Sequence, residues 1–271
     1  MKLVEKIKKK LVNDLKAIVE NFKPFIRTRN YLGFTLYYSK GTSLIARLNN
    51  NNLYEPETCN IIHKVLSEIS QPTFIDIGAN IGLISLFVLS ENSKAKVYAF
   101  EPGPHQADLL LKTIEKNNIK DRLIFERIAL SNSDSYLEFF IHNTKDVSGD
   151  GFIDTERAGV TTSIKVKSKR LDDWWNEQQK PQIDMIKIDT EGAEFWVLEG
   201  ASELIKTCRP LILTEMSKLN YCNYPYNEYD VLDLLHKYQY SVYNENGILT
   251  DKTNLSVFQK DGIDTYLCKP L

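Results

Sequence analysis

The sequence predicts an α/β fold in which a mostly parallel sheet carries helices on both faces. Between residues 73 and 216, short runs rich in β-branched and aromatic residues alternate with segments of helical periodicity. The strand runs are nearly continuous in apolar residues, which is typical of strands buried on both faces. Right-handed crossovers bring the carboxyl ends of parallel strands to one edge of the sheet, and ligands bind there.

The elements follow in a regular order after residue 56. A helix is expected over 57–70, then a strand over 73–77 and a helix over 82–90. Further strands are expected at 96–100, 123–130, 136–141, 162–166, 183–188 and 211–216, further helices at 104–117, 172–178, 193–206 and 226–238, and a terminal hairpin within 240–267.

Residues 1–57 differ from the rest and are predicted to form an extension to a larger domain at 58–271. Apolar residues recur at helical spacing in residues 1–30, where nine basic minus three acidic residues give +6. A basic amphipathic helix suits contact with an anionic membrane surface, but we favour packing on the domain or on a second subunit. A β-hairpin is expected over 31–48.

Composition excludes several classes of protein. The formal net charge of −2 argues against a nucleic-acid partner. The four cysteines are scattered without a CxxC pair, which disfavours zinc and disulfides. No run of about 18 apolar residues is present, and the N-terminus lacks the apolar core of a signal peptide. We therefore expect a cytoplasmic protein, with peripheral membrane contact as the alternative.

The strongest motif is DIGANIG at residues 76–82, where a strand ends in Asp-x-Gly and a helix begins at the second glycine. Glycines allow a tight turn and a close approach of a ligand to the backbone. Dinucleotide enzymes carry GxGxxG at this place, whereas this chain has GxxxG after an acidic residue. The acid favours a cationic ligand group over a phosphate. We therefore predict a turn that holds a positively charged moiety.

The next two strands add to this prediction. Glu101 ends the strand 96–100, and an acid at this position can accept hydrogen bonds from both ribose hydroxyls. Ile128 and Ala129, at the end of the third strand, are placed to flank an adenine ring. The combination predicts a nucleoside ligand.

Two more acids lie at strand ends. Asp189 follows the strand 183–188, and Glu215 lies at the end of 211–216. With Asp76 and Glu101 they make four acidic strand ends on the predicted edge, which indicates a binding site rather than surface decoration.

The chain resembles the FkbM family of class I methyltransferases. The resemblance rests on Tyr54-Glu55-Pro56, the motif at 76–82, Phe100-Glu101-Pro102, residues 186–194 (IKIDTEGAE), residues 197–201 (VLEGA) and residues 209–216. It covers roughly residues 50 to 217. The family implies a seven-stranded Rossmann-like sheet with an antiparallel last strand, and S-adenosylmethionine as cofactor. It also implies O-methylation of a hydroxyl on a sugar, a glycan or a related secondary metabolite.

The resemblance assigns cofactor contacts by position. Asp76, Gly78, Asn80 and Gly82 would hold the methionine portion and Glu101 the ribose. The full predicted set of cofactor-binding residues is Glu55, Asp76, Gly78, Ala79, Asn80, Gly82, Glu101, Pro102, Ile128, Ala129 and Asp189.

Methylation of an alcohol needs a base or a metal, because a neutral hydroxyl is a weak nucleophile. Asp189 is the first candidate for the base, Glu215 the second and His142 the third. A carboxylate set of Asp189, Glu191 and Glu215 would suit Mg²⁺, a reading that we favour less. The polar stretch 142–159 is a candidate lid over the acceptor.

Two other classes of function stay open. One is a nucleotide-binding oxidoreductase, disfavoured by the absence of GxGxxG and of a Tyr-x-x-x-Lys pair. The other is a non-catalytic protein of membrane-associated assemblies that uses the basic segment 1–30.

Overall fold

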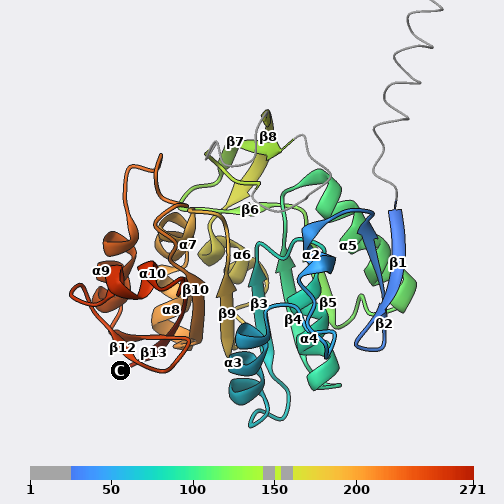
Figure 1. Ribbon diagram of the computed structural model, residues 1–271, viewed down its shortest axis with the longest axis horizontal. Coiled ribbons are helices and arrows are strands. Elements are labelled where there is room, and N and C mark those ends of the chain that lie inside the picture. Colours follow the sequence, from blue (N-terminus) through green and yellow to red (C-terminus); the bar gives the residue numbers. More distant parts are fainter. Residues whose placement is uncertain (1–25, 143–149, 154–160) are drawn as a thin grey trace, which may run out of the picture.

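The computed structural model describes residues 26–142, 150–153 and 161–271, and its centre is one eight-stranded sheet (Figure 1). The strand order is β12-β11-β13-β10-β9-β3-β4-β5. The bounds are β3 Thr73–Ile77, β4 Lys96–Phe100, β5 Leu123–Glu126, β9 Met185–Ile188, β10 Leu211–Glu215, β11 Tyr240–Asn244, β12 Leu249–Thr250 and β13 Thr265–Pro270.

The sheet confirms the predicted α/β fold and corrects its strand count. Strands β5, β4, β3, β9 and β10 pair in parallel, and β13 runs antiparallel between β10 and β11. The antiparallel last strand was expected, but the sheet has eight strands rather than seven. The additional strand is β12, a two-residue edge strand that forms where the chain turns back on β11 at Val242 and Tyr243.

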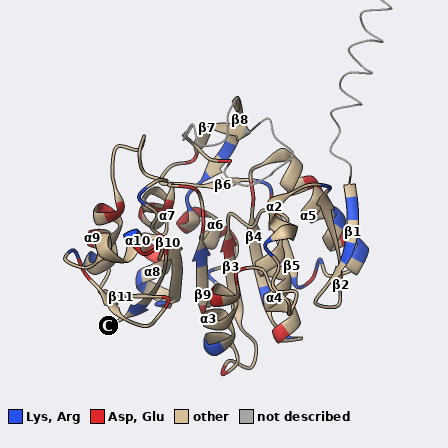
Figure 2. Cartoon of the chain, viewed as in Figure 1, with Lys and Arg blue, Asp and Glu red and all other residues tan. Residues whose placement is uncertain are grey.

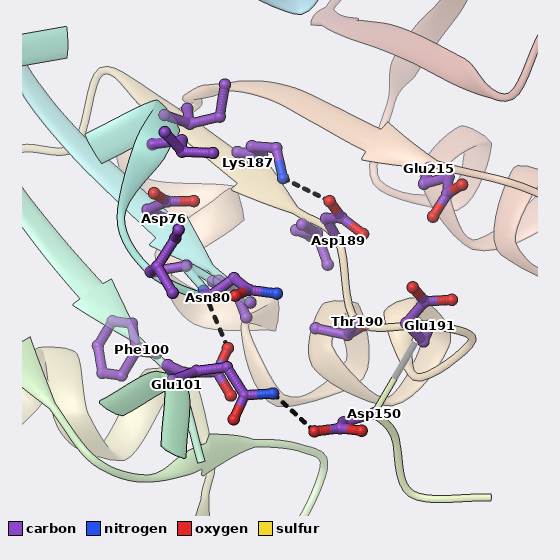
Figure 3. Close-up of a pocket in the computed structure, with 18 of the residues that line it drawn as sticks. Asp76, Asn80, Phe100, Glu101, Asp150, Lys187, Asp189, Thr190, Glu191 and Glu215 are labelled. Atoms are coloured by element: carbon purple, nitrogen blue, oxygen red, sulfur yellow. Dashed lines mark hydrogen bonds and ion pairs between the residues drawn. The ribbon is translucent and has the colours of Figure 1, made fainter. Parts of the chain in front are cut away.

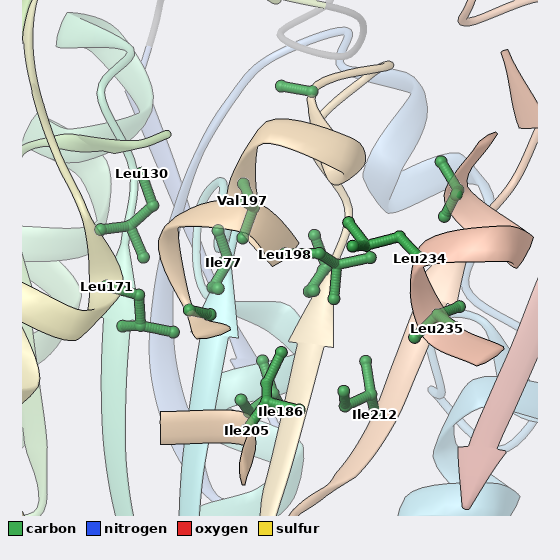
Figure 4. Close-up of a cluster of buried hydrophobic side chains, with 14 of the residues drawn as sticks. Ile77, Leu130, Leu171, Ile186, Val197, Leu198, Ile205, Ile212, Leu234 and Leu235 are labelled. Carbon is green, nitrogen blue, oxygen red and sulfur yellow. The ribbon is translucent and has the colours of Figure 1, made fainter. Parts of the chain in front are cut away.

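Helices cover both faces of this sheet. On one face lie α3 Pro56–Leu66, α4 Leu83–Glu91 and α5 Pro104–Asn117; the other face carries α6 Leu171–Glu177, α7 Glu194–Gly200, α8 Ser202–Cys208 and α9 Glu228–Lys237. Side chains alternate between the two cores along each strand. Ile77 and Ile186 join Val197 and Ile205 in the second core (Figure 4), whereas Phe74 and Met185 point into the first.

Side chains therefore share a face according to their register. Asp76 pairs with Lys187 across β3 and β9, so both charged side chains lie on the face covered by α3, α4 and α5. Both residues are buried within that layer.

The N-terminal hairpin lies earlier in the chain than predicted. It consists of β1 Ile26–Tyr31 and β2 Phe34–Ser39, while Ser43–Ala46 forms the short helix α2 instead of a second strand. The Thr42 side chain accepts a hydrogen bond from the Leu44 N–H, and this N-cap explains the helix. Residues 26–30 belong to a strand and not to the predicted helix, whose remaining residues 1–25 lie outside the described part.

Side chains of α5 hold the hairpin in place, because they form hydrogen bonds with backbone groups of β2 as a neighbouring strand would. The Asn117 carboxamide accepts from the Thr35 N–H at 2.8 Å and donates to the Thr35 carbonyl at 2.9 Å. The Thr113 hydroxyl accepts from the Tyr37 N–H at 3.0 Å. These bonds satisfy backbone groups along β2, an edge strand that would otherwise leave them unpaired.

Two further predicted elements are divided in the structure. The predicted strand 123–130 separates into β5 and the short β6 Ala129–Leu130, and the predicted helix 193–206 into α7 and α8. Strand β6 leaves the main sheet and pairs in parallel with β8 Thr161–Lys169, which pairs antiparallel with β7 Ser135–His142. The terminal segment also holds α10 Leu255–Lys260 between β12 and β13.

Candidate functional site

A cavity lies at the carboxyl ends of the parallel strands (Figure 3). Its walls come from the ends of β3, β4, β9 and β10, from residues 128–130, from Phe139, Asp150 and Phe152 beside the small sheet, and from residues 44–58. The cavity brings together most of the predicted site residues: Glu55, Asp76, Gly78, Ala79, Asn80, Glu101, Pro102, Ile128, Ala129, Asp189 and Glu215.

Two predicted residues have other positions. Gly82 does not contribute to the described cavity wall; it is the N-cap of α4 with φ +88, and its role is to begin the helix. His142 is the last residue of β7 in the small sheet, which is not the sheet whose edge carries Asp189 and Glu215. Of the candidate lid at 142–159, residues 143–149 and 154–159 lie outside the described part, so that prediction stays open.

The turn after β3 is built for close approach. The amides of Gly78 and Ala79 both donate to the Phe100 carbonyl at 3.0 Å, which ties the turn to β4. Gly78 has φ +79, and a Cβ there would lie 1.8 Å from the Asp189 carbonyl oxygen. Only glycine fits, because any side chain would collide with the backbone of β9. The turn, β4 and β9 therefore meet at one point.

Asp76 and Lys187 form a buried pair of charges below this turn, and the partly exposed Asp189 lies next to Lys187. The Ser85 hydroxyl donates to Asp76 Oδ2 at 2.6 Å, while Asp76 Oδ1 is buried without a hydrogen-bond partner among the described residues. Lys187 Nζ contacts Asp189 Oδ2 at 2.7 Å. Burial alone would lower the pKa of Lys187, but the carboxylates of Asp189, Glu55 and Asp76 raise it, so the ammonium stays charged.

Figure 2 shows charged residues interrupting the otherwise neutral strands β3 and β9. No role was predicted for Lys187, although a lysine inside the apolar strand Met185–Ile188 was a visible signal. Lysine is rarely buried unless it is paired.

Glu101 lies between the turn and the start of α5. Its Oε2 accepts from the Asn80 N–H at 2.9 Å and its Oε1 from the Gly103 N–H at 2.7 Å. Burial raises the pKa of Glu101 to about 7, although these two hydrogen bonds favour the ionised form. The carboxylate is thus held rigidly at the cavity wall with its orientation fixed by two backbone donors.

Asp189 also lies near two other carboxylates of the cavity wall, Glu191 and Glu215. Figure 3 shows Asp189, Glu191 and Glu215 around one open space. Asn220 donates to Glu215 Oε2 at 3.0 Å. Burial, followed by the charges of Asp189 and Glu191, raises the pKa of Glu215 well above its ordinary value. Its protonated form is therefore favoured more strongly than that of an ordinary glutamate.

Asp150, which was not predicted as a site residue, lines the cavity near Glu101. The Gln106 side-chain amide donates to Asp150 Oδ2 at 2.6 Å, and Gly151 pairs with Phe140 of β7. Phe152 packs against Phe139 and Trp196. These contacts join segments that are far apart in the chain, and no local pattern marks them.

No group of three or more His, Cys, Asp or Glu side chains among the described residues is arranged to hold a metal ion. Within the same residues, no helix combines the length and hydrophobicity needed to cross a bilayer.

Comparison with known proteins gives consistent matches. The model of the FkbM methyltransferase domain matches residues 76–242. Methyltransferase sdnD of Sordaria araneosa is 32% identical over 161 residues, which cover 49% of this chain and 62% of the relative.

Two further relatives have more specific names. The 2-O-methyltransferase NoeI of Sinorhizobium fredii is 30% identical over 164 residues, 56% of this chain and 66% of its own. The hexuronic acid methyltransferase AglP of Haloferax volcanii is 26% identical over 154 residues, 56% of this chain and 60% of its own. The matched regions span less than two thirds of these relatives.

Proposed function

The chain belongs to the FkbM methyltransferase family, and we propose that it transfers a methyl group from S-adenosylmethionine to a hydroxyl of a sugar or a related acceptor. The observation that carries this proposal is the meeting of the glycine turn, Glu101 and Asp189 at one cavity. The name of NoeI, a 2-O-methyltransferase, supports an oxygen as the methylated atom, and the name of AglP, a hexuronic acid methyltransferase, supports a sugar as the acceptor.

The residues present fit the cofactor. Gly78 leaves room at the place where a Cβ would close the turn, and the buried Asp76 Oδ1 still has capacity to accept a hydrogen bond. Glu55 and Asp76 would hold the amino end of the methionine portion, Glu101 the ribose hydroxyls, and Ile128 and Ala129 the adenine. When bound, the cofactor supplies a methyl group activated by a positively charged sulfur.

The chain's own residues would position the acceptor and remove its proton. Lys187 holds Asp189 Oδ2, and Asp189 Oδ1 makes no hydrogen bond with a described residue. Its side chain is 30% exposed, so an acceptor hydroxyl can reach it. Asp189 would act as a general base: its Oδ1 would accept the proton of the acceptor hydroxyl while the hydroxyl oxygen attacks the methyl group. Glu215, whose protonated form burial favours, would donate a hydrogen bond that orients the acceptor.

Paired substitutions test these two roles. Asp189→Asn should lower turnover by about 10²–10⁴-fold, the usual contribution of a general base, and should leave S-adenosylhomocysteine binding unchanged. Glu215→Gln mimics the protonated carboxyl and should keep turnover within about tenfold of the wild type. Turnover would be followed as S-adenosylhomocysteine release in a screen of sugar and lipid-linked glycan acceptors. Unchanged turnover of Asp189→Asn would remove Asp189 from the mechanism.

For residues 1–30, contact with an anionic membrane surface and packing on the domain or on a second subunit all remain predictions. Co-sedimentation of the chain with anionic vesicles, with and without residues 1–30, tests the first of them.

A further inference from the structure

One wall of the cavity comes from residues that precede the part matched by the family model. Leu44, Arg47, Tyr54, Glu55 and Thr58 all line the cavity, whereas the matched region begins at residue 76. Arg47 follows the last residue of α2, and its N–H donates to the Ser43 carbonyl at 3.0 Å. Leu44 anchors α2 in the core, so the backbone of Arg47 is fixed beside the cavity.

The charges around the cavity are unequal. Its described lining holds seven acidic side chains (Glu55, Asp76, Glu101, Asp150, Asp189, Glu191 and Glu215) and two cationic ones, Arg47 and Lys187. Lys187 is buried and engaged with Asp189. Arg47 is exposed, so its guanidinium is the cation on this described wall that a ligand can reach.

Arg47 lies close enough to Glu55 for their charges to interact. Burial raises the pKa of Glu55, and the positive charges of Lys187 and Arg47 oppose that rise. One wall of the cavity therefore presents a carboxylate and a guanidinium together. This arrangement complements a zwitterion, in which an ammonium and a carboxylate are attached to the same carbon.

We propose that Arg47 binds the α-carboxylate of the cofactor's methionine moiety, beside the amino group held by Glu55. The inference rests on the proposed function, because it takes S-adenosylmethionine as the ligand. A guanidinium matches a carboxylate with two parallel hydrogen bonds. A carboxylate on an acidic acceptor is the other source of the same chemistry. The cofactor is favoured because Arg47 and Glu55 lie together on the cavity wall, as an ammonium and a carboxylate on one carbon require.

Binding measurements on the full chain separate these sources without using activity. Calorimetry would compare S-adenosylhomocysteine with its decarboxylated analogue, which keeps the amine and lacks only the carboxylate. Arg47→Ala should weaken S-adenosylhomocysteine binding by about 10–100-fold, the range expected for a hydrogen bond to a charged group. The same variant and the wild type should bind the decarboxylated analogue with affinities within about twofold of each other. The reason is that the analogue lacks the carboxylate that Arg47 would bind.

Two variants complete the design. Arg47→Lys keeps the positive charge but not the planar guanidinium that can donate two parallel hydrogen bonds. It should therefore bind S-adenosylhomocysteine more tightly than Arg47→Ala and more weakly than the wild type. Lys64→Ala removes an exposed cation of α3 outside the described cavity wall and should change neither affinity.

The outcomes are distinct. Equal binding of S-adenosylhomocysteine by the wild type and Arg47→Ala would overturn the inference and leave the proposed function standing. Arg47→Ala could also leave cofactor binding unchanged and reduce the methylation of an acidic acceptor but not of a neutral one. That result would show that Arg47 binds a carboxylate of the acceptor, and it would overturn the inference. Failure of the wild type to bind S-adenosylhomocysteine would instead contradict the proposed function.

Discussion

At the scale of single residues, Glu101 links cofactor binding to pH. Burial raises its pKa to about 7, and only the ionised form offers both oxygens as acceptors to ribose hydroxyls. Affinity for S-adenosylhomocysteine should therefore weaken as the pH falls below about 7. Calorimetry across this range would measure the effect, and Glu101→Gln should bind about tenfold more weakly with a flatter pH profile. A pH-independent affinity of the wild type would contradict this role.

The same shift predicts the direction of a stability change in the ligand-free chain. The folded-state pKa of Glu101 lies above its ordinary value of 4.5, so the folded protein binds more protons than the unfolded chain between these values. The contribution of Glu101 to stability is fully present below pH 4.5 and is lost as the pH rises through about 7.

Lys187 is a residue whose removal should damage the fold as well as the site. It is buried between Asp76 and Asp189, so Lys187→Met would leave carboxylates buried without their cation. Breaking a buried ion pair in this way costs about 3–5 kcal/mol in the free energy of unfolding. Urea unfolding would measure the loss. Lys252→Met, which breaks the exposed pair with Asp233, is the matched control and should cost less than about 1 kcal/mol. Similar losses in both variants would refute a structural role for Lys187.

At the scale of elements, the turn between β3 and α4 depends on a missing side chain. Gly78 and Gly247 have similar φ angles of +79 and +76, but a Cβ at Gly247 would meet open space. Gly247→Ala should therefore cost only the left-handed backbone penalty of about 1–2 kcal/mol. Gly78→Ala adds a collision with the Asp189 carbonyl and should cost about 1–3 kcal/mol more, with loss of cofactor binding. Equal effects on unfolding would show that the turn tolerates a side chain.

Elements set by local pattern were predictable from the sequence. Strands β3 and β4 and helix α5 have the predicted bounds, because each is a short apolar run or an amphipathic segment flanked by clear boundary residues. The ends of β3, β4 and β9 also placed Asp76, Glu101 and Asp189 at one edge. Local pattern failed where long-range pairing decides the structure: β6 leaves the main sheet because it pairs with β8, about 39 positions further along the chain.

Two residues of the cavity wall, Asp150 and Arg47, were not predicted because their positions also depend on more than local pattern. Asp150 reaches the cavity through Gln106 and the pairing of Gly151 with Phe140. Arg47 reaches it because Thr42 begins a helix where a strand was expected. Neither contact follows from helix or strand periodicity, so the sequence pattern does not indicate that Asp150 and Arg47 line the cavity.

At the scale of the whole molecule, the cavity joins distant parts of the chain. Its lining runs from Leu44 to Thr265, and it includes residues from both hydrophobic cores of the sheet. A ligand bound there contacts segments that must all be folded at once. Binding should therefore raise the stability of the whole chain rather than of one segment.

This coupling gives a test that also separates the competing classes of function. At a concentration of 100 times its dissociation constant, S-adenosylhomocysteine should stabilise the chain by about 2.7 kcal/mol. For a chain of this length that corresponds to a rise in Tm of roughly 5–10 °C. Thermal unfolding would measure it, with NAD at equal concentration as the matched ligand. NAD should leave Tm unchanged, because the turn at Gly78 lies beside Asp76 and Asp189 and their negative charge repels a pyrophosphate. A rise in Tm with NAD alone would instead support a nucleotide-binding oxidoreductase.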